Sequence, residues 1–508
     1  MRSLPARIWS GHRLFVIVLI PAVLLRADTE LGYRWQAWFN DSFEYLANTV
    51  HFNLDPTRVS GYSVMLKILQ PLHSYALITI LQHLMGLAVG VMVYALARHR
   101  FGAPAWLATL AAVPVLYDGF EIQLEHLILS DASFLFVLML ATTLLLWEPP
   151  SPAGPSTRRS AVIGLLLGLG VVLRSVGEPL LVVFIVYMII RRFSWRKIAV
   201  TVVVGLVPVL TYAGMFDLEH GQFAMSDATG VFLYSRVMTF AECPKMHVPA
   251  DELFLCTVVP PGQRPIAQSY IWVSSTPLDR YQAPKFAQLP NKLAEDFAIR
   301  AIEAQPLDYA QAVWSDIWRV FGWPRQVFPQ AATYNEYLFL PQGLPIPSWD
   351  DASLGPYKSY AAAYVHGNPQ TQVVNPYAVI IRDYQKYIWL PGTVYGLIVL
   401  AGLGGIVLAW RRLGGEALLP WTISLALIVI PAATAEFDYR YVLPAVPFAC
   451  LAAVMAFSPG TAGRAWLRRL RDAGRRTVRP GAGTLAGPPP APASGAGDDE
   501  RDLATDGA

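Results

Sequence analysis

The sequence has few charged residues and few cysteines, and both shortages narrow the class of protein. Only 15% of its 508 residues are Asp, Glu, Lys or Arg, whereas 54% are hydrophobic. That balance leaves little room for a soluble enzyme with a membrane anchor. The basic residues flank apolar segments, so their placement gives no indication of nucleic-acid binding. The three cysteines show no zinc-site spacing and are too few for a disulfide-based fold.

Familiar motifs of catalytic and nucleotide-binding sites are also missing. The sequence contains no H-E-x-x-H metal motif, no Walker loop and no G-x-S-x-G elbow. It shows no internal repeat, which counts against a transporter built from inverted repeats. The function must therefore be inferred from polar side chains at the edges of the apolar segments.

Ten apolar segments approach the length of about 20 residues that a helix needs to cross a bilayer. Turns with two or more Arg or Lys residues connect alternate segments, and the positive-inside rule places these turns in the cytoplasm. We therefore predict an all-α polytopic protein of the cell membrane with both termini cytoplasmic. The expected spans are 14–26, 75–97, 103–117, 128–147, 160–173, 178–191, 198–216, 388–410, 417–433 and 440–457.

These spans divide the chain into four parts. Residues 1–216 hold seven spans with acidic external loops, and residues 388–457 hold the last three. Residues 217–387 are hydrophilic, so we expect a folded external domain there. Residues 458–508 are rich in Arg, then in Gly, Pro and Ala, then in acidic residues, which predicts a disordered cytoplasmic tail.

Two of the three cysteines lie in the external segment. An oxidising environment permits a disulfide between Cys243 and Cys256, and the alternative is two free thiols. Cys450 lies in the last expected span and reads as a small buried hydrophobic residue.

The first external loop contains a pair of acids suited to catalysis. Asp41 and Glu44 are three residues apart, so in a helix they share one face. Such a pair can act as a general base and as an orienting or metal-binding carboxylate. The alternative is structural, because Asp followed three residues later by Glu also forms a helix capping box.

The second external loop carries three acids at helical spacing. Asp118, Glu121 and Glu125 fall on one face of a helix, although like charges four residues apart destabilise a helix by about 0.2–0.5 kcal/mol. They are candidates for binding sugar hydroxyls or a divalent cation. The alternative is a solvated helical face.

Two arginines depart from the Lys- and Arg-poor pattern of the outer face. Arg174 precedes Glu178 between the fifth and sixth spans, where ionisable groups mark a functional or paired site. Its alternative is a side chain that snorkels to the interface. Arg440 lies at the mouth of the final span, where a guanidinium can hold a phosphate through two hydrogen bonds.

Three of these external stretches resemble a known family. They are DSFEYLANT…PTRVSGYSVMLKIL, DGFEIQLEHLILSDASFLFVL and EFDYRYVLPAVP. They are similar to loops of the polytopic GT-C glycosyltransferases, of the phospholipid-carrier-dependent type related to protein mannosyltransferases and lipid A aminoarabinose transferases. The resemblance covers residues 10–455 and implies a GT-C-like fold with an external active site.

The resemblance also implies roles for individual residues. Asp41 is the general base or, with Glu121, a ligand of a divalent cation such as Mg²⁺ or Mn²⁺. Many relatives carry two adjacent acids where this chain has Asp41 followed by Ser42. We expect Asp41 and Glu44 to be catalytic. The expected substrate-binding residues are Asp118, Glu121, Glu125, Arg174 and Arg440.

The predicted function is transfer of a hexose or pentose from a polyprenyl-phosphate donor, with inversion at the anomeric carbon. The expected partners are this donor, membrane lipids and an acceptor glycan, lipid or protein of the cell envelope. One alternative is a lipid-linked polysaccharide polymerase or ligase, although the arginines of residues 217–387 form no cluster in the sequence. Another is a transporter or flippase of a lipid-linked sugar, although no charged residue lies near the middle of an apolar span.

Overall fold

Helices form nearly all of the regular structure in the part of the chain that the computed structural model describes, residues 4–148, 154–343, 346, 357–412 and 414–458. The one sheet in these residues has two antiparallel strands, β1 (Tyr33–Arg34) and β2 (Gln372–Val373), with Tyr33 opposite Val373. The predicted helical class is therefore confirmed. Residues 459–508 of the predicted tail lie outside the described residues.

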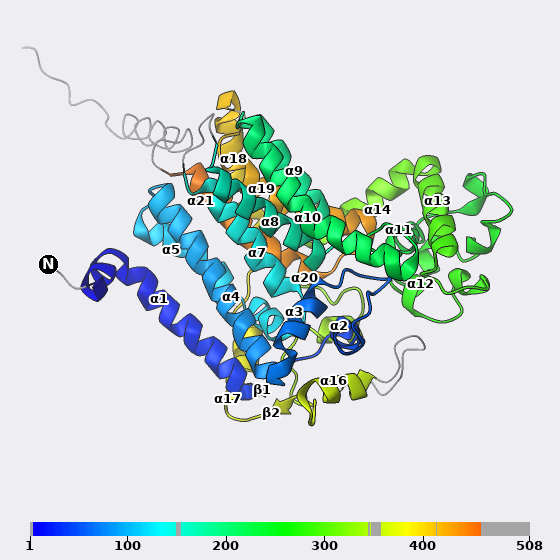
Figure 1. The fold of residues 1–508 in the computed structure, drawn as a ribbon, viewed down its shortest axis with the longest axis horizontal. Coiled ribbons are helices and arrows are strands. Elements are labelled where there is room, and N and C mark those ends of the chain that lie inside the picture. The colour runs from blue at the N-terminus through cyan, green and yellow to red at the C-terminus, as the bar shows by residue number, and fades with distance from the viewer. Residues whose placement is uncertain (1–3, 149–153, 344–345, 347–356, 413, 459–508) are drawn as a thin grey trace, which may run out of the picture. The chain divides into compact units, whose positions relative to one another are not determined.

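An α-helix occupies each of the ten predicted apolar segments (Figure 1). Among the described residues, three helical segments are long and apolar enough to cross a membrane, or five when each of two bent helix pairs counts as one span. Ten spans therefore stay a prediction. The ten segments form α1 (Leu4–Gly32), α4 (Tyr75–Ala95), α5 (Ala105–Tyr117), α7 (Asp131–Leu146), α8 (Thr157–Leu173), α9 (Gly177–Ile190), α10 (Trp195–His220), α18 (Gly392–Leu408), α19 (Leu418–Thr434), and α20 (Tyr439–Val442) with α21 (Val446–Ala456).

The two bent pairs owe their bends to residues with extended backbone. Asp118 separates α5 from α6 (Gly119–His126), which are bent by 52°, and its side chain accepts a hydrogen bond from the Phe120 N–H. Pro391 directly precedes α18, which is bent by 59° from α17 (Tyr377–Tyr387). A residue that caps one helix cannot continue the previous one, so each bend places polar groups beside the apolar helices.

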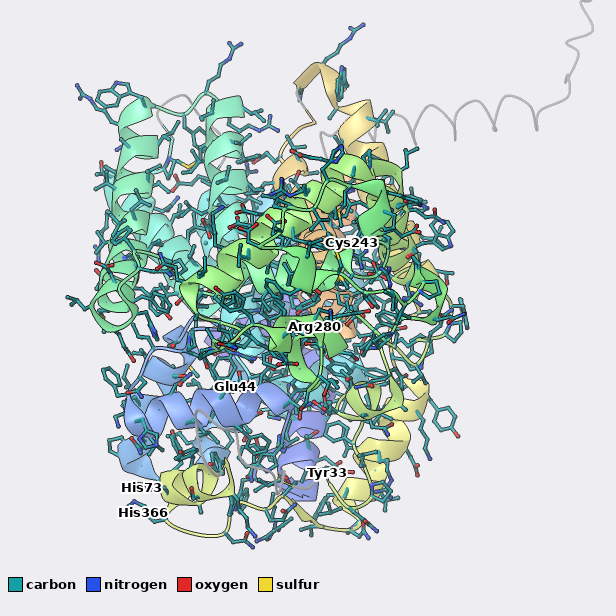
Figure 2. All side chains as sticks on the ribbon, turned by 90° about the vertical axis from the view of Figure 1, so that its right-hand side faces the viewer. Tyr33, Glu44, His73, Cys243, Arg280 and His366 are labelled. Atoms are coloured by element: carbon teal, nitrogen blue, oxygen red, sulfur yellow. A yellow bond between two sulfur atoms is a disulfide. The ribbon has the colours of Figure 1, made fainter. Side chains whose placement is uncertain are left out.

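Residues 217–387 contain a hydrophobic core of their own. Tyr234, Phe297 and Leu255 are fully buried in it. Cys243 (Figure 2) packs against this core and forms a disulfide with Cys256. The helices of these residues not yet named are α11 (Thr229–Val237), α12 (Ser269–Trp272), α13 (Gln288–Ala304), α14 (Pro306–Arg319), α15 (Ala331–Asn335) and α16 (Tyr357–Val365).

The predicted first external loop forms two helices, α2 (Asn40–His51) and α3 (Gly61–Leu69). α16 packs against α2, and next to these helices the rings of His73 and His366 lie side by side with centroids 3.8 Å apart (Figure 2). The remaining short turns are Gln70–Leu72, the π-helical Leu96–Arg100, Cys243–Lys245, Leu253–Leu255, Pro261–Gln263, Pro277–Arg280, Trp410–Arg412 and Leu443–Ala445.

Small residues allow α8 and α10 to pack closely along their length. A Cβ at Gly164 would overlap the backbone of Thr201, and a Cβ at Gly168 would overlap the carbonyl oxygen of Gly205. Close approach of backbones through small residues is a common way for apolar helices to associate in membranes. The pair α8–α10 thus depends on the absence of side chains at these positions.

Gly168→Ala tests this packing. The added methyl group has no space at the α8–α10 contact, so we expect a loss of about 1–3 kcal/mol in unfolding free energy. Gly214→Ala in α10 is the matched control, because a Cβ there meets nothing within 4 Å. Thermal or denaturant unfolding in detergent measures both variants. Equal stability of the two variants would contradict the close contact.

Candidate active site

Charged side chains from the predicted first external loop meet those of four later segments in one place. We call this group the arginine–carboxylate cluster. Its reach along the chain is large, because Asp41 and Arg440 are 399 positions apart. The cluster comprises Asp41, Glu44, Arg58, Asp131, Arg174, Glu336, Asp438 and Arg440.

Asp41 lies in the first turn of α2 and carries two ion pairs. Its Oδ1 is 2.8 Å from Nη1 of Arg58, and its Oδ2 accepts from Nη1 of Arg440 at 2.7 Å. The capping interpretation of Asp41 and Glu44 is wrong, because α2 is capped by Ser42, whose Oγ accepts from the Phe39 N–H at 3.0 Å. The Asp41 side chain is therefore directed into the cluster.

Arg58 connects the two acids that the sequence places on one helical face. Its Nη2 is 2.5 Å from Oε2 of Glu44, which lies on α2 (Figure 2), while Nη1 holds Asp41. The guanidinium also lies 5.7 Å from the ring centroid of Tyr45. The sequence analysis missed Arg58. The predicted first external loop also contains Arg34 and Lys67, so the sequence alone did not single out Arg58.

The electrostatics of Asp41 are set by opposing effects. Burial raises the pKa of Asp41, whereas the guanidinium groups of Arg440 and Arg58 lower it, and the net pKa lies well below the usual range. Asp41 is therefore anionic at neutral pH. A divalent cation at this carboxylate would have to displace a guanidinium group from one of its oxygens.

Arg440 is held by an aromatic frame but keeps one unused donor. Its guanidinium carbon lies 4.9 Å from the ring centroid of Phe39 and 5.4 Å from that of Tyr441. Its buried Nε has no hydrogen-bond partner among the described residues, and Oδ2 of Asp438 is 3.9 Å away. Asp438 accepts a hydrogen bond from the hydroxyl of Tyr337. An anion at the Nε position would satisfy this donor.

Arg174 belongs to the arginine–carboxylate cluster, but its partner is not the acid next to it in the sequence. It pairs with Asp131 at the start of α7, whereas Glu178, the nearby acid, is exposed. The guanidinium carbon is 5.6 Å from the ring centroid of Tyr441, the residue that follows Arg440. Arg174 is thus a paired arginine at the cluster.

Glu336 is an acid of the cluster that sequence reasoning missed. It is 7% exposed, and its carboxylate accepts from the Asn40 backbone N–H at 3.2 Å and from Asn40 Nδ2 at 2.6 Å. Burial raises the pKa of Glu336 to about 8, and the charges of Asp41 and Asp438 act in the same direction. Glu336 therefore holds a proton at pH 7. The surrounding sequence has no helical periodicity that would have marked it.

The three acids of the second loop are buried, so the interpretation as a solvated helical face is wrong. Asp118 caps α6, accepts from the Leu390 N–H at 3.0 Å and lies 3.3 Å from Nη2 of Arg325. Glu121 lines a small cavity, and its Oε2 is buried without a hydrogen-bond partner in the described part of the chain. Glu125 instead forms a buried ion pair with Arg26.

An apolar cavity opens beside these acids. Arg319 and Arg325 provide its cationic groups, and the cavity that contains Asp118 and Glu121 shares one lining residue with it, Val446. The apolar part of its wall consists of Val320, Gly322, Pro324, Leu390, Gly392, Tyr395, Tyr439, Val442 and Val446.

One group of side chains among the described residues has donor atoms close enough to hold a metal ion. Ligand atoms of Glu30, His83 and His126 all lie within 4.8 Å of one another. The two expected metal ligands, Asp41 and Glu121, are not part of this group. A divalent cation is thus compatible with the fold at a site that the sequence analysis did not identify.

Comparison of sequences finds no counterpart, because no family model and no curated protein matches this chain. Solved structures do resemble it. The oligosaccharyltransferase AglB from Archaeoglobus fulgidus, in complex with an inhibitory peptide and a dolichol-phosphate, is 14% identical at a TM-score of 0.43, covering 95% of this chain and 53% of its own. The chain thus spans about half the length of AglB.

Two further solved structures give similar values. ArnT from Cupriavidus metallidurans bound to undecaprenyl phosphate is 13% identical at a TM-score of 0.34, over 88% of this chain and 77% of its own. A complex of the Archaeoglobus fulgidus oligosaccharyltransferase with Zn and sulfate is 14% identical at a TM-score of 0.40, covering 90% of this chain and 50% of its own. AglB and ArnT are GT-C membrane glycosyltransferases, the superfamily that the sequence resembles. At these TM-scores the activity must be argued from this chain's own residues.

The pKa of Glu336 gives a testable pH dependence. Because folding raises this pKa from 4.5 to about 8, the contribution of Glu336 to stability is fully present below pH 4.5 and is lost as the pH rises through 8. Glu336→Gln cannot ionise, so its melting temperature should fall less over this range than that of the native chain. Glu303→Gln, at an exposed position, should follow the native chain. Parallel curves for all three proteins would refute the buried, protonated Glu336.

Proposed function

We propose that this chain is a membrane glycosyltransferase that moves a sugar from a polyprenyl-phosphate donor to an acceptor hydroxyl at the external membrane face. The observation that carries the proposal is the position of Asp41 between Arg58 and Arg440. This arrangement places a carboxylate base directly beside cations that can bind a phosphate. The reaction needs both, because the acceptor loses a proton while the donor releases a phosphate.

The transfer is a single displacement. The acceptor oxygen forms a bond to the anomeric carbon, and the bond from that carbon to the phosphate oxygen breaks. Asp41 takes the proton of the acceptor hydroxyl, and the polyprenyl phosphate leaves with the bonding electron pair. Attack from the face opposite the phosphate inverts the anomeric centre.

Arg440 couples donor binding to the basicity of Asp41. Without a donor, two guanidinium groups depress the pKa of Asp41 and make it a weak base. The donor phosphate competes for Arg440, whose Nε is an unused buried donor. When Arg440 turns to the phosphate, Asp41 loses one of its two cations and its proton affinity rises. The base thus becomes effective only when a donor is present.

Other members of the cluster orient the reactants. Arg174 adds positive charge near Arg440 through the shared neighbour Tyr441. Glu336 is protonated at neutral pH and can donate a hydrogen bond to a sugar hydroxyl. Glu44 keeps Arg58 in place beside Asp41.

We expect the lipid part of the donor to lie against the apolar side chains that surround the cavity containing Leu390 and Val442. Arg319 and Arg325 line the same cavity, so a lipid that carries an anionic head group finds both kinds of contact there. Asp118 and Glu121 line the adjoining cavity and are suited to sugar hydroxyls. Glu125 is less suited, since both of its oxygens accept from Arg26. The site then lies on the external face, with both termini cytoplasmic.

The variant Asp41→Asn tests the base. We expect loss of transfer by about 10²–10⁴-fold, because the amide cannot accept the proton. Transfer is measured in membranes offered a panel of labelled polyprenyl-phosphate sugars. The control is Asp383→Asn, an exposed acid paired with Lys386, which should keep full activity. Near-native transfer by correctly folded Asp41→Asn would exclude Asp41 as the base. No transfer from any donor by the native chain would favour a polymerase or a transporter.

Substitution of the two arginines by lysine separates their roles. In Arg440→Lys the charge stays but the hydrogen bond from Nε is lost, so the KM for the donor should rise about 10–100-fold, the cost of one hydrogen bond to a charged group. Arg58 is not assigned to bind the donor phosphate. Arg58→Lys should therefore change kcat more than the KM for the donor. Equal effects of both substitutions on the donor KM would contradict a phosphate-binding role specific to Arg440.

A further inference from the structure

A second cluster of polar side chains lies between α1, α4 and α6 and takes no part in the proposed transfer. Glu30 lies near the end of α1, His83 lies in α4, and His126 is the last residue of α6. The imidazoles are 3% and 0% exposed, and Glu30 is 9% exposed. Nε2 of His83 is 3.2 Å from Nδ1 of His126, and Oε1 of Glu30 is 3.7 Å from each of these nitrogens.

The outer nitrogen of each imidazole must act as a hydrogen-bond donor. Nε2 of His126 is 2.7 Å from the backbone oxygen of Tyr33, which can only accept. Nδ1 of His83 is 2.8 Å from Oε2 of Glu125. That carboxylate is paired with Arg26 by two hydrogen bonds of 2.7 Å, so it also accepts. Neutral rings therefore carry their protons on the outer nitrogens.

The inner nitrogens of the two rings consequently face each other with lone pairs. Neither can donate to the other, and Glu30 adds two carboxylate oxygens without a hydrogen-bond partner among the described residues. Thr79 lies beside Glu30, and the nearest acceptor for its single hydroxyl hydrogen is the backbone oxygen of Trp35 at 2.9 Å. Buried acceptors that face one another are unfavourable unless a positive group lies between them.

The spacing of these three acceptors matches the coordination shell of a transition metal. Nitrogen and oxygen ligands of a tetrahedral zinc ion lie about 2.0–2.2 Å from the metal, which places them roughly 3.4 Å from one another. The observed separations are 3.2 and 3.7 Å. The outer hydrogen bonds of the histidines, to a carboxylate and to a backbone carbonyl, are also those that metal-binding histidines make.

The surrounding sequence makes room for this arrangement. Gly86 is one turn along α4 from His83, and a Cβ at Gly86 would overlap the carboxylate of Glu125. A larger residue there would push Glu125 away from both His83 and Arg26. The absence of a side chain thus permits the contact that fixes the His83 tautomer.

We propose that Glu30, His83 and His126 bind one Zn²⁺ or a similar divalent transition-metal ion, which joins the end of α1 to α4 and α6. Two imidazoles and one carboxylate suit this class of ion, whereas Mg²⁺ prefers a shell of oxygen ligands. The role of the ion is structural. It is independent of the transfer chemistry, because Arg58, Arg440 and Asp41 belong to a different cluster.

Metal content of the purified full chain tests the proposal. The protein is treated with a chelator in detergent, supplied with Zn²⁺, passed over a gel-filtration column and analysed for bound metal. We expect about one zinc per chain for the native protein. The same content is expected for His247→Gln, which alters an exposed histidine of the large segment. His83→Gln and His126→Gln should lose the zinc.

A second measurement covers the case in which the histidine variants fail to fold. Glu30→Gln keeps the size of the side chain but removes its charge, so a folded Glu30→Gln protein should bind Zn²⁺ more weakly than the native chain. Zn²⁺ should also raise the melting temperature of the native chain and of His247→Gln, whereas Mg²⁺ should not. Zinc retained at native levels by folded histidine variants would place the ion elsewhere and overturn the proposal. Absence of zinc from the native chain would overturn it too, in favour of a proton between the rings. None of these readouts depends on glycosyl transfer.

Discussion

The single negative charge of Asp41 holds two distant parts of the chain together. Arg58 comes from the same loop as Asp41, whereas Arg440 lies 399 positions after Asp41 in the chain. A buried charge without its partner costs about 3–5 kcal/mol, so each of these three groups constrains the others. The positions of α2 and α20 are thereby linked, and any ligand that draws Arg440 away must offer a charge of its own in exchange.

The charge balance of the cluster favours the arrival of such a ligand. Arg58, Arg174 and Arg440 face several carboxylates, but not all of these carry a charge at neutral pH. Burial raises the pKa of Asp438, and raises that of Glu336 to about 8. Glu336 therefore stays protonated beside an incoming phosphate, which lessens the repulsion that a fully ionised set of acids would exert, and the raised pKa of Asp438 acts in the same direction. The same low dielectric that makes an unpaired charge expensive strengthens every contact between an arginine and a bound phosphate.

Helix positions and several site residues could be predicted because their signals are local. Hydrophobic runs marked the helices, and the scarcity of Arg and Lys on the outer face marked Arg174 and Arg440. The partners could not be predicted, because ion pairs across long separations leave no local pattern. Glu125 was open to a solvated interpretation because Arg26 lies 99 positions away. Glu336 lies in a stretch without periodicity, so only the fold reveals it.

The two polar clusters differ in what they leave unsatisfied, and this difference separates their roles. At the arginine–carboxylate cluster the unused group is a donor, the buried Nε of Arg440. Around His83 and His126 the unused groups are acceptors, while the outer nitrogens are fixed by hydrogen bonds. An unused cationic donor favours binding of an anion, and Arg440 can pair with Asp41 through Nη1 when that anion leaves. Unused acceptors with fixed neighbours call for a cation and offer no internal replacement for it. The first arrangement therefore suits a substrate that binds and departs, and the second suits a resident ion.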